Sequence, residues 1–149
     1  MFRINRKIDY SIRVMLCLDK RPIGSRLPTK SVQDEMLIPR PFLQRIIANL
    51  SHSNLLLTYP GPNGGIELAR PPSKINLLQI WEATEGIVTI SECIKSMGEC
   101  PFDPCCPIRN YWIHLQNIIT NELENITLEI LASEEYSIDS MKYYRYKNF

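Results

Sequence analysis

Four of the five cysteines lie within fourteen residues, in the segment CIKSMGECPFDPCC at positions 93–106. Six residues separate Cys93 from Cys100 and five separate Cys100 from Cys106, with Cys105 directly before the last thiol. Thiolates at this density suit a zinc ion, an iron–sulfur cluster or direct redox sensing. Zinc sites usually contain cysteines paired as C-x-x-C, and this segment contains no such pair. The odd total argues against a closed disulfide framework.

The chain carries no pattern typical of a catalytic site, a membrane span or a signal peptide. No general-base histidine accompanies the cysteines, and no phosphate-binding glycine loop follows a strand, so an enzyme is not expected. No apolar run reaches the roughly 18 residues of a membrane span. The basic N-terminus lacks the apolar core of a signal peptide. We therefore expect a cytoplasmic protein with no membrane partner.

Charge is segregated along the sequence, although the net charge is only +1. Residues 1–80 contain twelve Lys and Arg against five Asp and Glu, whereas residues 81–149 contain five against eleven. A basic half beside an acidic half indicates that one end of the protein meets a polyanion, although chance segregation of surface charge gives the same pattern.

The basic half has the pattern of a winged helix-turn-helix. An amphipathic helix is predicted over 5–20, with Asn5 as its cap. A short helix then begins at Thr29, and a third helix lies within PRPFLQRIIANLSHSN at 39–54. Apolar runs on both sides of PGPNGG at 60–65 predict a hairpin, the wing. Two helices joined by a short break and followed by a hairpin are typical of DNA-binding proteins.

Several polar side chains in this half are candidates for contact with double-stranded DNA. The third helix carries polar and basic side chains near its start. The tip of the wing offers an asparagine side-chain amide and glycine N–H groups, and the N-terminal segment is basic. The candidates are Arg40, Gln44, Arg45, Asn63, Gly64 and Lys7, with Arg3 and Arg6 near Lys7. Phosphate contacts of this kind make binding steeply dependent on salt.

The acidic half is predicted to contain a helix over 75–86, the cysteine segment and one long amphipathic helix of about 25 residues within 107–135. A single chain of this size has little core left to cover so long an apolar stripe, so we expect a homodimer. The expected domains are a winged helix-turn-helix at 1–74, a linker helix, cysteine loop and dimerisation helix at 75–132, and a tail at 133–149. The fold class is mainly α with a small β wing.

Three stretches of the sequence, taken in their order along the chain, resemble the IscR/NsrR group of bacterial regulators. These regulators belong to the Rrf-two family of winged-helix transcription factors. They are GPNGGIELARPP at 61–72, INLLQIWEATEG at 75–86 and NITL at 125–128. The similarity covers residues 1 to about 132. It implies a homodimer in which the long helices cross-pack and the two winged domains bind a palindromic operator.

The resemblance also implies a cofactor. In several members three cysteines of the loop hold an iron–sulfur cluster that senses redox state, nitric oxide or iron–sulfur status. By position these are Cys93, Cys100 and Cys106, with Cys105 as a possible alternative ligand. Arg109 replaces the histidine that IscR-like members use as fourth ligand. An aspartate donated by the partner's first helix serves NsrR-like members, and Asp9 matches it.

Other interpretations remain open from the residues alone. Asp9 and Arg13 are four residues apart on one helix, which is the spacing of an ordinary surface ion pair. The cluster could be a 4Fe-4S or a 2Fe-2S form. A regulator without a cluster, controlled by zinc, thiol oxidation or a partner protein, is the alternative function. Cys17, on the apolar side of the first predicted helix, is interpreted as a packing residue.

Overall fold

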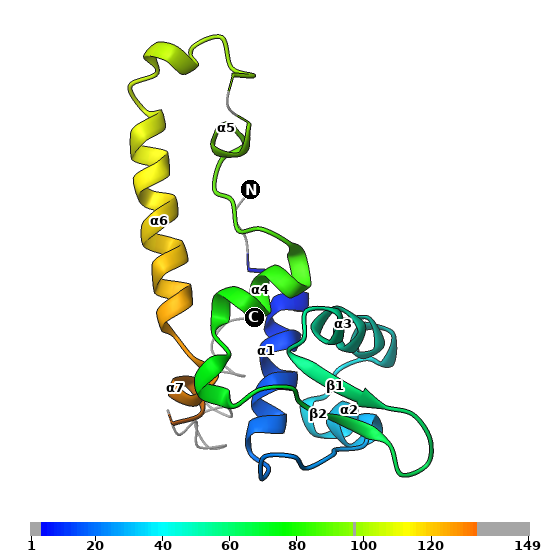
Figure 1. Ribbon diagram of the computed structural model, residues 1–149. Coiled ribbons are helices and arrows are strands. Elements are labelled where there is room, and N and C mark those ends of the chain that lie inside the picture. The colour runs from blue at the N-terminus through cyan, green and yellow to red at the C-terminus, as the bar shows by residue number, and fades with distance from the viewer. Residues whose placement is uncertain (1–3, 97, 134–149) are drawn as a thin grey trace, which may run out of the picture.

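The computed structural model describes residues 4–96 and 98–133, and its elements form a helical body, a two-stranded hairpin and a long arm (Figure 1). The body gathers α1, α2, α3, α4 and α7, and the hairpin lies beside it. No helix among the described residues is long and apolar enough to cross a membrane. In chain order the elements are α1 Arg6–Asp19, α2 Thr29–Met36, α3 Arg40–His52, β1 Leu56–Tyr59, β2 Gly65–Leu68, η1 Pro72–Lys74, α4 Leu77–Glu85, α5 Glu92–Lys95, η2 Asp103–Cys105, α6 Arg109–Asn125 and α7 Leu128–Ser133.

The first helix begins where the sequence predicts. The Asn5 side chain accepts hydrogen bonds from the backbone N–H groups of Lys7 and Ile8, which satisfies two donors that have no partner within the helix. The buried side of α1 forms the centre of the core, since Val14, Met15 and Cys17 are fully inaccessible to solvent. Helices α2, α3, α4 and α7 all pack against this helix.

The helix-turn-helix consists of α2 and α3. Helix α2 begins at Thr29 with Pro28 as its N-cap residue, and Pro39 has the same place before α3; neither helix has a side-chain cap. Leu37 ends α2 in the left-handed region with φ of 53°, an unusual conformation for a bulky residue. Leu43, Ile46 and Leu50 form the buried stripe of α3. Phe42 is 43% exposed, and its ring packs edge-on against Tyr10.

The predicted wing is present as the antiparallel pair β1 and β2, with Leu56 opposite Leu68 and Tyr59 opposite Gly65. Leu27 forms an isolated antiparallel bridge beside β2, in which it exchanges two backbone hydrogen bonds of 2.9 Å with Ile66. Glycine is required at position 65, where a Cβ atom would lie 2.4 Å from the carbonyl oxygen of Leu27. The wing is thereby attached to the segment that leads into α2.

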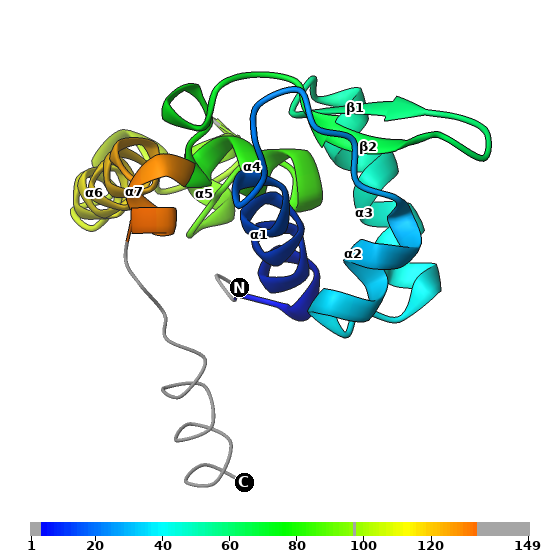
Figure 2. The same cartoon turned by 90° about the horizontal axis from the view of Figure 1, so that it is seen from below.

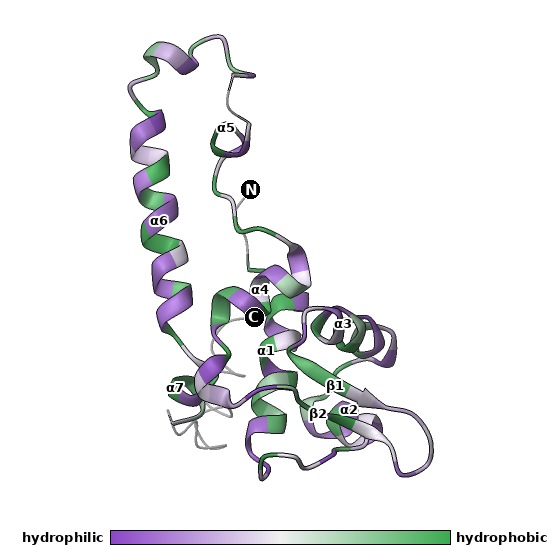
Figure 3. Ribbon diagram, in the orientation of Figure 1, coloured by the Kyte–Doolittle hydropathy of each residue, from purple (hydrophilic) through white to green (hydrophobic). Residues whose placement is uncertain are grey.

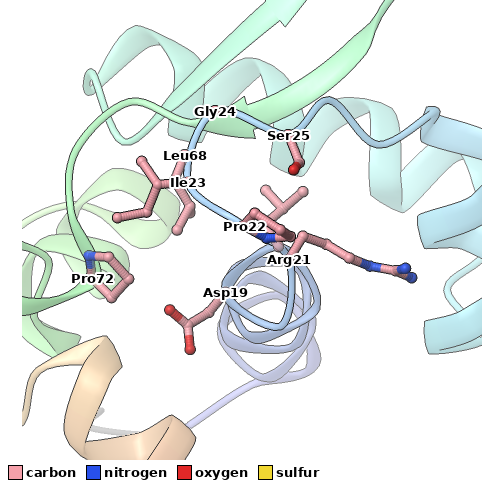
Figure 4. Close-up of a pocket in the computed structure, with 9 residues that line it drawn as sticks. Asp19, Arg21, Pro22, Ile23, Gly24, Ser25, Leu68 and Pro72 are labelled. Carbon is pink, nitrogen blue, oxygen red and sulfur yellow. The ribbon is translucent and has the colours of Figure 1, made fainter.

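The loop between α1 and α2 lies over the end of the sheet. Together with Leu68 and Pro72 it surrounds a small hollow that the carboxylate of Asp19 also lines (Figure 4). Burial, and secondarily the nearby Glu129 of α7, raises the pKa of Asp19. The hollow lies between the end of α1, the loop that follows it, the end of β2 and the start of η1.

Helix α4 is fixed at both ends and ties the second half of the chain to the first. Asn76 and Gln79 form a reciprocal capping box at its start, and Gly86, with φ of 83°, stops it. The buried hydroxyl of Thr84 donates to Ser11 Oγ of α1 over 2.9 Å. Contacts between α1 and α4 are the most extensive between any two helices of the described chain.

The prediction of one continuous C-terminal helix was wrong. Helix α6 ends at Asn125, Ile126 is extended, and α7 begins at Leu128. The interruption has a tertiary cause: Leu77 N–H donates to Ile126 O over 2.9 Å, and Leu128 N–H donates to Ile75 O over 2.8 Å. This antiparallel bridge lets α7 turn into the body, where Leu128 is fully buried. The predicted tail at 133–149 lies outside the described residues except for Ser133.

Candidate metal-binding arm and nucleic-acid interface

The arm is built from residues 87–96 and 98–108 together with α6, and Gln116 of α6 fastens its base. The Gln116 side chain accepts a hydrogen bond from Ile90 N–H over 3.0 Å and donates to Val88 O over 2.7 Å. Val88 itself is buried beside Ile8 and Trp81. One amide side chain therefore holds the ascending segment against α6 immediately before the cysteines begin.

The tip of the arm is organised around Asp103. Its carboxylate accepts from Gly98 N–H over 2.6 Å and pairs with the Arg109 guanidinium over 2.5 Å, while the two side chains are only 9% and 11% exposed. The Asp103 N–H donates to Cys100 O over 3.0 Å. These contacts, the Gly98 N–H first among them, lower the pKa of Asp103. The carboxylate thus closes the loop by joining the two sides of the cysteine segment.

The thiols lie along this arm, and none is in a disulfide. Cys93 lies in α5 with its Sγ 3.0 Å from Ser91 Oγ. Cys93, Cys100 and Cys106 are half-buried, whereas Cys105, in η2, is exposed. Within residues 4–96 and 98–133, no three His, Cys, Asp or Glu side chains are arranged to hold a metal ion.

Asp9 lies on α1, in the body of the molecule. Its carboxylate is 2.8 Å from the Arg13 guanidinium, and both side chains are about half exposed, at 47% and 48%. The cysteine-bearing end of the arm rises away from α1 of the same chain (Figure 1). Asp9 is therefore accessible to a second molecule, while its present partner is a residue of its own helix.

The candidate DNA residues of α3 share one exposed surface. Arg40, Gln44 and Arg45 are all exposed on α3. Arg40 and Gln44 line an open groove between α2 and α3, whose other polar lining side chains are Thr29, Lys30 and Gln33. The sequence interpretation missed these three α2 residues. Their spacing on an amphipathic helix directly before the turn is the signal that would have indicated them.

The other two candidate regions differ in how free their side chains are. Asn63 is exposed at the tip of the wing, and Gly64 N–H is already bonded to Gly61 O over 3.0 Å. Lys7 Nζ lies 2.9 Å from Glu85 Oε1, which links α1 to the end of α4. Arg6 is exposed, and Arg3 lies outside the described residues. The wing tip and α3 are thus open to a ligand, while Lys7 is engaged within the protein.

Cys17 is remote from the arm and belongs to the core. Its thiol lies 3.5 Å from Glu35 Oε2, and Glu35 also pairs with Arg21 over 2.6 Å. Burial, reinforced by Glu35, raises the pKa of Cys17 to about 11. The sequence interpretation of this residue as a packing residue agrees with its complete burial.

Hydrophobic residues alternate with polar ones along α6 (Figure 3), and several of the hydrophobic ones are exposed. Ile119 and Leu123, nearer its C-terminus, pack against the small core of Ile8, Trp81 and Val88. The exposed stripe comprises Ile108, Tyr111, Leu115 and Ile118, with Ile118 51% exposed. A connected apolar surface of this kind on a helix is typical of an interaction surface.

Two sequence comparisons identify related proteins. A family model described as "Rrf2: Iron-dependent Transcriptional regulator" matches residues 4–134. The HTH-type transcriptional regulator NsrR of Shouchella clausii is 29% identical over 128 residues, which cover 85% of this chain and 86% of that protein. NsrR of Oceanobacillus iheyensis is 26% identical over 133 residues, covering 89% and 90% of the two chains.

Solved structures show the same fold. The chain is similar to CymR, titled the global cysteine regulator of B. subtilis, with a TM-score of 0.73, 24% identity, and coverage of 91% of this chain and 99% of that one. It is also similar to T. potens IscR, with a TM-score of 0.66, 20% identity and coverage of 99% and 94%. The mainly helical fold with a small wing is therefore confirmed.

Proposed function

This chain belongs to the Rrf2 (Rrf-two) family of transcriptional regulators, and from that membership we propose that it is a homodimeric DNA-binding sensor whose arm thiols hold an iron–sulfur cluster. Its relatives and its fold are those of regulators and not of enzymes. The observation that carries the sensor proposal is the placement of four free thiols on one arm that projects from a DNA-binding body.

In the proposal, α3 of each subunit enters a major groove of a palindromic operator. Arg40 and Gln44 face a groove open to solvent, and Arg45 is exposed beside them, so all three can reach base edges or phosphates. Asn63 and the backbone near Gly64 contact phosphate at the wing. Lys7 is a further phosphate contact, and its ammonium group would leave the ion pair with Glu85 to bind the phosphate.

The proposed dimer uses the exposed stripe of α6. Tyr111, Leu115 and Ile118 follow one another at helical spacing and remain exposed in the single chain. Covering such a stripe with the same stripe of a second copy removes apolar surface from water at roughly 25 cal/mol per Å². A two-fold arrangement of this type also brings two copies of α3 into the symmetric relation that a palindromic operator requires.

The residues present fit an iron–sulfur cluster by their chemistry. Cys93, Cys100 and Cys106 supply soft thiolate ligands, are only half-buried and are free of disulfides. Asp9 is the proposed fourth ligand, donated by the other subunit, because Arg109 is committed to Asp103 and a guanidinium does not ligate iron. When bound, such a cluster supplies iron–sulfide chemistry that responds to redox state and nitric oxide.

The protein's own side chains would connect this site to the DNA-binding surface. Gln116 fixes the segment before Cys93 to α6, and Thr84 and Glu85 join α4 to Ser11 and Lys7 of α1. Helix α1 in turn packs against α3. A change in the position of the arm is therefore passed through α4 and α1 to the recognition helix.

The experiment is an anaerobic purification with iron and sulfide analysis and a visible absorption spectrum. We expect wild-type protein to be coloured, and Cys93→Ala, Cys100→Ala and Cys106→Ala each to lose iron and sulfide. Cys105→Ala is the matched control, because it removes the adjacent thiol, and it is expected to retain both. A colourless wild-type protein without iron would contradict the cluster.

Control by thiol oxidation is the second candidate function, and the exposure of Cys105 is the observation that favours it. In that case the same purification yields an iron-free protein. Mild peroxide treatment would then change DNA affinity in the wild type and have less effect in Cys105→Ala.

A further inference from the structure

Three side chains on the outer face of the wing form a connected group, referred to below as the wing brace: Arg26, Tyr59 and Glu67. The Arg26 guanidinium carbon lies 3.6 Å from the centroid of the Tyr59 ring. The Tyr59 hydroxyl donates to Glu67 Oε1 over 2.7 Å, and Arg26 Nε lies 3.9 Å from Glu67 Oε2. Each member contacts the other two, although they come from three different segments of the chain.

The brace lies where the wing meets the helix-turn-helix. Arg26 precedes Leu27, whose backbone pairs with that of Ile66 in β2. Pro28, two residues after Arg26, is the N-cap residue of α2, which begins at Thr29. In both views the turn of the hairpin extends beyond the helices (Figures 1 and 2). The side chain of Arg26 therefore crosses β2 and joins the root of the projecting wing to the residues that lead into α2.

The chemistry of the group makes Arg26 its central member. Glu67 is nearly buried, with 12% of its side chain exposed, so its carboxylate needs both the Tyr59 hydroxyl and a nearby cation. The hydrogen bond from Tyr59 to Glu67 raises the pKa of the phenol. Arg26, half exposed, stacks its planar face on the ring, which a lysine ammonium does not do.

We propose that Arg26 is a positioning residue that, through Tyr59 and Glu67, fixes the orientation of the wing relative to α2 and α3. This orientation sets which phosphates the wing reaches when α3 lies in the major groove, and therefore contributes to operator selection. The inference rests on the proposed DNA contact of the wing. Arg26 acts through Tyr59 and Glu67, and not through a phosphate of its own.

The test uses a 30-base-pair duplex enriched by the full-length wild-type protein from a random library, with an unselected duplex of equal length as the reference. We expect Arg26→Lys to weaken binding to the enriched duplex about fivefold, since a stacked cation contributes about 1 kcal/mol. Tyr59→Leu, which also removes the hydrogen bond to Glu67, should weaken it at least as much. Affinity for the unselected duplex should stay within about twofold. Arg21→Lys, a change in the same loop, is the matched control and should bind as wild type.

Two further measurements separate positioning from the alternatives. The double variant Arg26→Lys/Tyr59→Leu should lose no more affinity than Tyr59→Leu alone, because the ring on which Arg26 stacks is already absent in that single variant. Arg26→Ala should leave the salt dependence of binding unchanged, whereas loss of a direct phosphate contact lowers the slope by about 0.9. Circular dichroism melting of each variant confirms folding, and affinity is compared only among variants that melt as wild type.

The proposal is overturned if Arg26→Lys binds the enriched duplex as wild type, if both duplexes lose affinity equally, or if the two single losses multiply in the double variant. If the wild-type protein enriches no duplex at all, the proposed DNA function fails instead. The two failures are therefore distinguishable.

Discussion

At the scale of single residues, Asp9 has the most informative position. Its ion pair with Arg13 is the ordinary (i, i+4) contact, and both side chains are about half exposed. Such a pair contributes about 0.3–0.5 kcal/mol to stability, which is too little to explain why a carboxylate is present at position 9. A role for Asp9 beyond that pair is a prediction that requires a second subunit.

Substitution of each partner of the pair separates the two roles. Asp9→Asn and Arg13→Gln both break the ion pair, so both should change the free energy of unfolding by no more than about 0.5 kcal/mol. If Asp9 is a ligand, only Asp9→Asn should alter the visible and electron paramagnetic resonance spectra of anaerobically purified protein. Identical wild-type spectra in both variants would rule out ligation by Asp9.

Cys17 is the residue whose thiol should be least reactive. Burial raises its pKa to about 11, from an ordinary value of 9.0. In folded protein at pH 8 we expect iodoacetamide to modify the exposed Cys105 quickly and Cys17 only after unfolding, as measured by peptide mass spectrometry. Modification of Cys17 in the native protein at the rate of Cys105 would show that α1 opens.

The raised pKa of Cys17 also has a pH signature. Because the folded-state value lies above the ordinary one, the protonated thiol favours the folded state. That contribution is fully present below about pH 9 and is lost as the pH rises to about 11. The unfolding free energy of wild type minus that of Cys17→Ala, from urea titrations, should therefore be smaller at pH 10.5 than at pH 8.

At the scale of elements, local patterns determined most of the fold. Asn5 and Gly86 mark helix ends by local chemistry alone, and the PGPNGG turn marks the wing. The break between α6 and α7 was missed because its cause is a long-range pairing of Ile126 and Leu128 with Ile75 and Leu77. A helical apolar period continues across such a break, so periodicity cannot reveal it.

Gln116 is an element-scale contact with a direct test. Gln116→Met keeps the size of the side chain but removes both hydrogen bonds to the segment before Cys93. Loss of these bonds, at about 1 kcal/mol each, should speed hydrogen exchange of the Ile90 amide by at least about tenfold. Asn121→Met, at an exposed position of the same helix, is the matched control. Unchanged hydrogen exchange at the Ile90 amide would mean that the two Gln116 hydrogen bonds do not hold the arm in solution.

At the scale of the whole molecule, the sequence indicated the candidate site residues but not how they are held. Residue type and helical position predicted Arg40, Gln44 and Arg45 as DNA contacts, and all three side chains are exposed on α3. Gln116 was missed because its hydrogen bonds go to backbone groups, and such bonds leave no pattern of residue types. Asp103 was missed because its partners, Gly98 N–H and the Arg109 guanidinium, are brought to it by the folding of the loop. The Asp-Pro pair at 103–104, typical of turns, was the available signal for Asp103.

The exposed stripe of α6 makes a prediction about assembly. Ile118→Glu places a charge in the proposed interface and should convert the protein to a monomer of 17.3 kDa, against about twice that mass for the wild type, in sedimentation equilibrium. Asn117→Glu, about 100° around the same helix, is the matched control and should remain dimeric. A wild-type protein that sediments as a monomer at micromolar concentration would contradict the proposed dimer.

The central claim is that the arm thiols control DNA binding through a bound cluster. The most direct measurement is the affinity for the enriched duplex of anaerobically prepared protein before and after iron removal, in wild type and in Cys93→Ala/Cys100→Ala/Cys106→Ala. We predict that iron removal changes the wild-type affinity at least about tenfold, a coupling of about 1.4 kcal/mol, and leaves the triple variant unchanged. An iron-free wild type and a triple variant that both bind the duplex as well as untreated wild-type protein would contradict the account.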